Sequence, residues 1–165
     1  MWWEPTNVVK FLMGYAPFVK SLVYSPERHT VDNKIREGDG AEYKTEHIYN
    51  EFHTGDWWFE TQKKIGEGET IVPLLLGSDK THLSEHKGDI SAHPVYLTIG
   101  NLSQELRRSQ KLPGTLLLGF VPVIRSPKDS TGKRASVPRW VLLDVYHQSL
   151  ELMLACKKLL YLELL

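Results

Sequence analysis

The sequence lacks most of the features that would assign a protein to a class at once. One cysteine, Cys156, stands among its 165 residues, which excludes an internal disulfide and a zinc site of several cysteines and fits a reducing compartment. Its 20 basic and 20 acidic residues leave no net charge, which excludes a histone-like polycation and a disordered acidic tail. The sequence contains no P-loop, no dinucleotide-binding glycine motif, no nucleophile elbow and no zinc-protease motif.

Long hydrophobic runs are missing too. The apolar stretch 11–19 is interrupted by Pro17 and lacks the positively charged start of a signal peptide. The leucine-rich stretch 140–165 carries charged residues throughout, whereas a membrane-spanning helix needs about 20 predominantly apolar ones. We therefore expect a chain that is neither secreted nor in a membrane, with a nuclear or cytoplasmic location.

The charges that are present are unevenly distributed. Residues 27–60 hold nine acids and four bases, whereas residues 103–139 hold eight bases and two acids. A local basic cluster can bind a polyanion such as DNA even in a neutral chain. Solvated loops are also often basic without binding anything, so both interpretations stay open. The basic residues that we expect to contact DNA are Arg107, Arg108, Lys111, Lys133 and Arg134.

Prolines and glycines interrupt residues 1–40, and we expect this segment to be loosely structured. We expect residues 41–165 to form the folded part of the chain. It begins with a helical pattern over 41–65, which Gly55-Asp56 divides into two helices.

Three short apolar runs follow, and each predicts a buried strand. They lie at 70–76, 94–99 and 115–124. Asn101 or Ser103 is placed to cap a short helix between the second and third strands. A last helix is expected to begin near Pro138, because proline is favoured in the first turn.

Asp79 directly follows the first predicted strand. A carboxylate held at the end of a buried strand is where a metal-binding acid of a two-metal phosphoryl-transfer site would lie. The alternative is that Asp79 caps a turn. With His82 and His86 it also forms D-x-x-H-x-x-x-H, which could bind zinc on a helix, but this segment is typical of a loop and offers no evident fourth ligand.

The stretch from about Gly55 to Val123 resembles the Plavaka transposases of fungi, in the Kyakuja-Dileera-Zisupton group of DDE/D transposases. The resembling motifs, in order, are GDWW at 55–58, SDKT at 78–81, PVYLTIGN at 94–101, LRR at 106–108 and LLGFVPV at 117–123. Tyr146-His147 further along also resembles a Phe-His position in the family.

The resemblance implies an α+β or α/β fold with a partial ribonuclease H-like core, in which three antiparallel strands and then a helix follow a helical preamble. Asp79 matches the first catalytic acid and would bind a divalent metal such as Mg²⁺ in a complete core. The sequence departs from the family pattern at His93, where an aromatic is usual, and at Ile90, where a lysine is usual.

By this resemblance the chain stops at Leu165, before the second and third catalytic acids. We therefore expect a truncated, transposase-derived fragment that does not catalyse alone and needs no cofactor by itself. A missing fourth strand would leave a sheet edge exposed, so we also expect self-association. The alternative is a non-catalytic DNA-binding or protein-interaction module.

Overall fold

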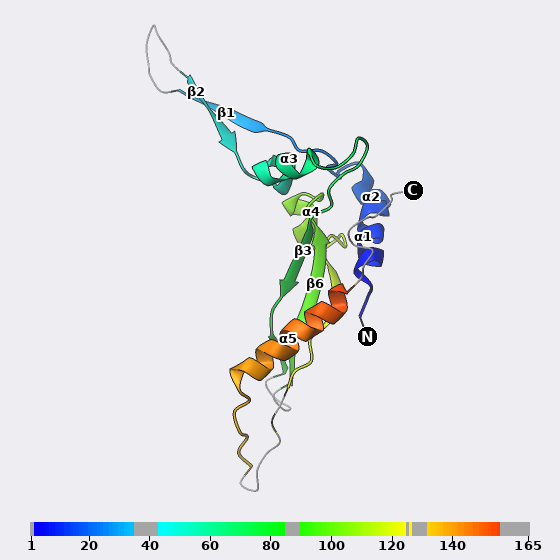
Figure 1. The fold of residues 1–165 in the computed structure, drawn as a ribbon, viewed down its shortest axis with the longest axis vertical. Helices are drawn as coiled ribbons and strands as arrows, with labels where there is room; N and C mark the ends of the chain where they lie inside the picture. Colours follow the sequence, from blue (N-terminus) through cyan, green and yellow to red (C-terminus); the bar gives the residue numbers. More distant parts are fainter. Residues whose placement is uncertain (1, 35–42, 85–89, 125, 127–131, 156–165) are drawn as a thin grey trace. The chain divides into compact units, whose positions relative to one another are not determined.

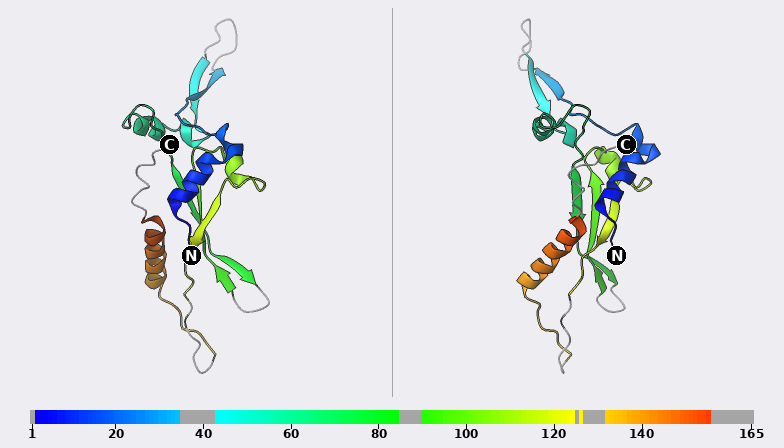
Figure 2. Two further views of the ribbon diagram at one scale, coloured as in Figure 1. Left: turned by 90° about the vertical axis from the view of Figure 1, so that its right-hand side faces the viewer. Right: turned by 45° about the vertical axis from the view of Figure 1, so that its right-hand side comes forward.

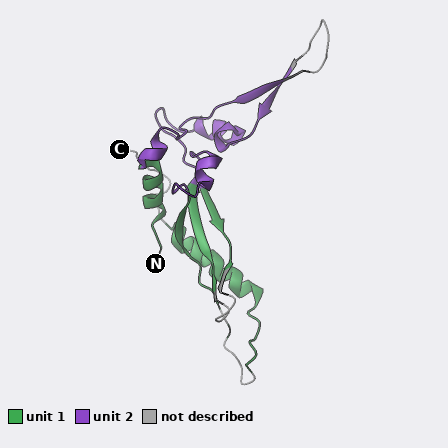
Figure 3. Ribbon diagram, turned by 180° about the vertical axis from the view of Figure 1, so that it is seen from behind, with its two compact units in different colours: residues 1–14, 75–98, 115–165 green, residues 15–74, 99–114 purple. Residues whose placement is uncertain are grey.

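The computed structural model describes residues 2–34, 43–84, 90–124, 126 and 132–155. They form two compact units, each made of segments that are separate in the sequence (Figure 3). Unit 1 consists of residues 1–14, 75–98 and 115–165. Unit 2 consists of residues 15–74 and 99–114.

The described residues include a three-stranded sheet (Figure 1). Its middle strand is deeply buried. Its strands, in spatial order, are β3 (Leu74–Ser78), β6 (Pro94–Ile99) and β7 (Leu116–Phe120). All residues of β6 except Tyr96 are buried, as expected for a continuous apolar run. A strand is therefore present near each of the three predicted places. The first is shifted from 70–76 to Leu74–Ser78 and the third is shortened to Leu116–Phe120, and only β6 is as buried as predicted.

The strands of this sheet are antiparallel. Val95 of β6 lies opposite Gly119 of β7, and Leu97 lies opposite Leu116. On the other side of β6, the Ser78 hydroxyl donates to the carbonyl of Pro94 at 3.1 Å, near the end of β3. The amide of Gly100 donates to the carbonyl of Pro73 at 2.8 Å, just before β3 begins. The two contacts run in opposite order along the two strands, so β3 is antiparallel to β6.

In unit 1, the N-terminal segment of the chain packs against β7. Helix α1 (Pro5–Gly14) lies alongside β7 in both views of Figure 2. Its apolar face buries Val8, Val9, Leu12 and Met13. The amide of Trp3 donates to the carbonyl of Leu118 at 2.8 Å, which ties the segment before the helix to the strand.

Residue 119 has to be glycine for this packing. A Cβ atom there would lie 2.9 Å from the Cβ of Trp2, closer than packed carbon atoms approach. The glycine of the LLGFVPV motif therefore permits the N-terminal segment to lie against β7.

Unit 1 also contains a hairpin and a long helix. Strands β4 (Thr81–Ser84) and β5 (Ile90–Ala92) form the antiparallel hairpin. Helix α5 (Arg139–Leu154) begins directly after Pro138, close to the predicted start. The ring of Tyr146 stacks on that of His93, with 5.3 Å between their centres.

Unit 2 begins with the short helix α2 (Ala16–Val19) and a second antiparallel hairpin, β1 (His29–Lys34) and β2 (Tyr43–Ile48). The helix that we predicted over the first part of 41–65 is wrong, because residues 43–48 form β2. Each residue of β2 pairs with one of β1, and the Thr45 hydroxyl donates to Asp32 across the pair at 2.6 Å. Cross-strand partners thus override a weak helical pattern.

The second half of that prediction is confirmed. After the short turn η1 (Phe52–Thr54), helix α3 (Asp56–Gln62) begins at Asp56 and buries Trp58 completely. Helix α4 (Gln104–Arg108) is the predicted short helix between the second and third strands. Its cap is Ser103, whose hydroxyl accepts from the amide of Leu106.

Asn101 has a different role from capping. Its buried side chain donates to the carbonyls of Val23 and Ile71 at 2.8 and 3.0 Å. The amide of Val23 in turn donates to the carbonyl of Asn101 at 3.0 Å. One side chain therefore joins three stretches of unit 2.

The described residues before 41 form regular helices and a strand, whereas we expected loose structure there. They include α1, α2 and β1. Pro5 is the first residue of α1 and Pro17 lies in the first turn of α2. Proline is favoured at these positions because the amide it lacks would have no partner within the helix. Pro5 and Pro17 therefore lie in the first turns of helices and do not interrupt the segment.

Candidate functional site

Asp79 lies directly after β3 and is exposed. A two-ion magnesium site needs further carboxylates beside it. Within the described residues, however, the group of three or more ligating side chains close enough to share an ion is Glu27, His29 and His53, without Asp79. The side chains of His82 and His86 lie outside the described part of the structure. The described residues at this position thus fit one magnesium ligand and do not fit a two-ion site.

Arg107 faces the interior of unit 2 instead of solvent. Its guanidinium lies 3.2 Å from the Glu51 carboxylate, and the two side chains are 12% and 17% exposed. It also donates to the carbonyl of Leu102 and lies over the Phe52 ring, 5.2 Å from its centre. The other oxygen of Glu51 accepts from the amide of Gln104 at 2.7 Å. This pair joins α4 to η1, so Arg107 has a structural partner that the sequence did not reveal.

Arg108 and Lys111 are exposed on α4 and the turn after it. With the Gln104 amide in its hydrogen-bonded orientation, the amide oxygen accepts from both terminal nitrogens of Arg108 at 3.0 and 2.9 Å. The amide of Lys111 donates to the hydroxyl of Ser109 at 3.2 Å, which shapes the turn. Unit 2 therefore presents these two cations to solvent.

Lys133 and Arg134 are exposed in the segment that precedes α5 in unit 1. The structure thus divides the predicted DNA-contacting residues into two sets on different units. Arg107, Arg108 and Lys111 are grouped at α4, and Lys133 and Arg134 are neighbours before α5.

A polar network around Arg28 was missed in the sequence. Its guanidinium lies 3.3 Å from Asp56 and 3.0 Å from His47, and 4.4 Å above the centre of the Phe59 ring. The Tyr49 hydroxyl donates to Asp56 at 2.9 Å, and this hydrogen bond raises the pKa of Tyr49. The network joins β2 to α3, and the wrong helix prediction for residues 43–48 concealed it.

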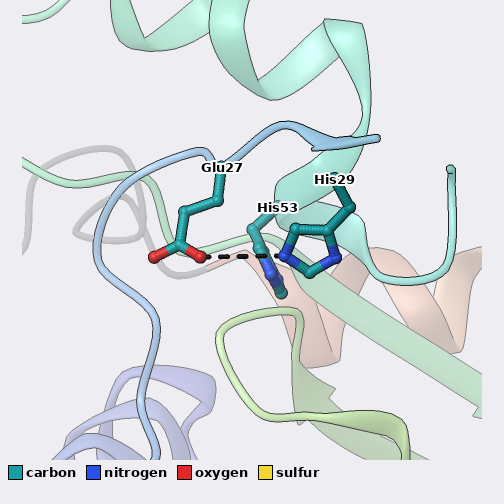
Figure 4. A group of neighbouring side chains, drawn as sticks. All are labelled: Glu27, His29 and His53. Atoms are coloured by element: carbon teal, nitrogen blue, oxygen red, sulfur yellow. Dashed lines mark ion pairs between the residues drawn. The ribbon is translucent and has the colours of Figure 1, made fainter. Parts of the chain in front are cut away.

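Glu27, His29 and His53 form a second polar cluster in unit 2 (Figure 4). The carboxylate of Glu27 lies 3.8 Å from Nε2 of His29. The rings of the two histidines meet edge to face, with 5.6 Å between their centres. His53 is buried, and burial lowers the pKa of its imidazole, which favours the neutral ring.

Comparison with known proteins gives one match. A family model described as Plavaka transposase matches residues 1–159, nearly the whole chain and more than the stretch that carries the recognisable motifs. No curated protein and no solved structure matches. Among the residues that the structure describes, no helix is long and apolar enough to cross a membrane.

The neighbours Arg107 and Arg108 allow a matched stability test. We expect Arg107→Met to lower the free energy of unfolding by roughly 1.5–3 kcal/mol, because it leaves the largely buried Glu51 carboxylate without its partner. Arg108→Met should change it by no more than about 0.5 kcal/mol, as is usual for an exposed side chain. Urea denaturation followed by circular dichroism measures both values. Equal effects of the two substitutions would contradict a structural role for Arg107.

Proposed function

The chain belongs to the Plavaka transposase family, and from that premise we propose that it acts in DNA transposition as a DNA-binding part that does not cut DNA by itself. We further propose that β3, β6 and β7 are the opening strands of a ribonuclease H-like core. The proposal includes a nuclear or cytoplasmic location, as expected from the sequence.

The position of Asp79 is the observation that carries this proposal. Its carboxylate is exposed at the end of β3. By resemblance, Asp79 matches the first metal-binding acid of the family, and on that basis we relate the chain to phosphoryl transfer. In a complete core, Asp79 would be one ligand of Mg²⁺, which supplies charge stabilisation for attack on a phosphodiester. The described residues provide no second carboxylate that forms a three-ligand group with it. The role that we propose is therefore DNA contact and not DNA cleavage.

The exposed bases support the DNA-binding half. Arg108 and Lys111 in unit 2, and Lys133 and Arg134 in unit 1, present positive charge to solvent. Such side chains contact phosphates without regard to sequence, and each contact releases counterions from DNA. Arg107 supports this surface indirectly, because its pair with Glu51 fixes α4.

Removing the exposed bases in pairs should weaken DNA binding. For Arg108→Gln with Lys111→Gln, and for Lys133→Gln with Arg134→Gln, we expect about a tenfold or greater loss of affinity. The slope of log affinity against log salt should become shallower by about 2 for each pair. Fluorescence anisotropy with a labelled duplex measures both quantities.

The matched control for these variants is Lys63→Gln with Lys64→Gln, an exposed basic pair after α3. It should leave affinity and salt slope close to those of the unchanged chain. Absence of duplex binding at low salt, or an equal loss in the control, would refute the proposed contacts.

The proposal that the chain does not cut DNA by itself is tested separately with supercoiled plasmid. We expect the purified chain with Mg²⁺ to produce no more nicked DNA than the same chain with EDTA, because no group of three or more metal ligands among the described residues includes Asp79. Gel electrophoresis measures the nicked fraction. Mg²⁺-dependent nicking that is lost in Asp79→Ala but kept in Asp144→Ala, an exposed acid of α5, would overturn this half.

The position of β3 at the edge of its sheet supports a second proposal, which is self-association of the chain. Among the described strands it pairs with β6 alone, and its Leu76 is 44% exposed. A strand with one free side can pair with a strand of another chain. We therefore propose that copies of the chain associate through this edge.

Sedimentation velocity over a range of concentrations tests this association. We expect the mean mass to rise with concentration, and Leu76→Lys to reduce the rise because a charge on an edge strand opposes pairing. Leu152→Lys, at an exposed leucine of α5, is the control and should not reduce it. A monomer at every concentration, with a sharp two-state melt, would contradict the proposal.

A further inference from the structure

The cluster of Glu27, His29 and His53 is not used by the proposed function, and it lies in unit 2, whereas Asp79 lies in unit 1. Its members come from two stretches of the chain. Glu27 precedes β1, His29 is the first residue of β1, and His53 is the middle residue of η1. Figure 4 shows the three side chains gathered at one point, with Glu27 and His29 facing each other.

The cluster has the size of a metal site. Each side chain offers one ligand atom, and these atoms all lie within 4.8 Å of one another. Ligands around tetrahedral zinc, each about 2.0–2.1 Å from the ion, are separated by roughly 3.3 Å. The Glu27–His29 separation of 3.8 Å is already close to that value. Small side-chain rotations would close the rest of the difference.

The backbone around the cluster is fixed before any ion binds. The amide of Glu27 donates to the carbonyl of His53 at 3.1 Å, so the two segments are joined at the cluster. The turn that holds His53 is closed by Thr54, whose hydroxyl donates to the carbonyl of Glu51 at 2.8 Å. His53 itself is 8% exposed, so its neighbours restrict its ring. Ordering of the ligands therefore costs little on binding.

We propose that Glu27, His29 and His53 bind one divalent transition-metal ion of the zinc class. Two imidazole nitrogens and one carboxylate suit Zn²⁺, whereas Mg²⁺ prefers oxygen ligands throughout. Three protein ligands leave a fourth position for water. The bound ion links the start of the β1–β2 hairpin to η1, and so stabilises the hairpin within unit 2. The proposal does not depend on DNA binding.

Titration of the full, EDTA-treated chain with Zn²⁺ alone, followed by calorimetry, tests the site. We expect one ion per chain at this site, and the NMR signals of the His29 and His53 rings to shift as it fills. His29→Gln and Glu27→Gln should each weaken the affinity by at least about tenfold, because even the loss of a group that only supports a ligand has an effect of this size. Both side chains are partly exposed, so neither substitution removes a buried group.

Two controls separate this site from the other histidines. His47 pairs with Thr30, next to the pair of His29 with Ile48, so it points to the opposite face of the hairpin. His47→Gln, and the double variant His82→Gln with His86→Gln, should leave the affinity unchanged. The proposal is overturned if Zn²⁺ does not bind, if His29→Gln binds it as well as the unchanged chain, or if either control abolishes binding.

Discussion

Backbone hydrogen bonding of the buried strand β6 is the constraint on which the other features depend. Its apolar side chains place it in the interior, where every amide and carbonyl needs a partner. Strands β3 and β7 supply partners on its two sides. This pairing places Asp79 directly after the end of β3. At the end of β6, the chain continues through Gly100 to Asn101. A Cβ atom at Gly100 would lie 3.0 Å from the Cβ of Pro73, so a larger residue at this exit would have to displace the proline slightly.

In unit 2, buried polar side chains add to apolar packing around residues such as Trp58 and Leu102. Asn101 joins three stretches of unit 2, and the Arg107–Glu51 pair joins α4 to η1. The pair is largely shielded from water, so removal of one partner leaves a charge that is expensive to accommodate. The bases of residues 103–139 therefore occupy two kinds of environment. Arg107 pairs with Glu51 in the interior of unit 2, whereas its neighbour Arg108 is exposed to solvent.

The elements that could be predicted from the sequence are those with a strong local pattern. Continuous apolar runs indicated all three strands of the main sheet, and Ser103 and Pro138 indicated two helix starts. Strand β2 could not be predicted, because its pairing with β1 depends on residues far away in the sequence. The position of Asp79 followed from its strand. The partner of Arg107 and the Glu27, His29 and His53 cluster depend on contacts between distant segments, which no local pattern encodes.

The proposed DNA-binding role is tested most directly by the amide NMR signals of the full chain during titration with a short duplex. The proposal predicts that the signals that shift fall in 104–111 and 133–139, around the exposed bases, and that added salt reverses the shifts. Shifts confined to the acidic stretch 27–60, or no shifts at low salt, would contradict it.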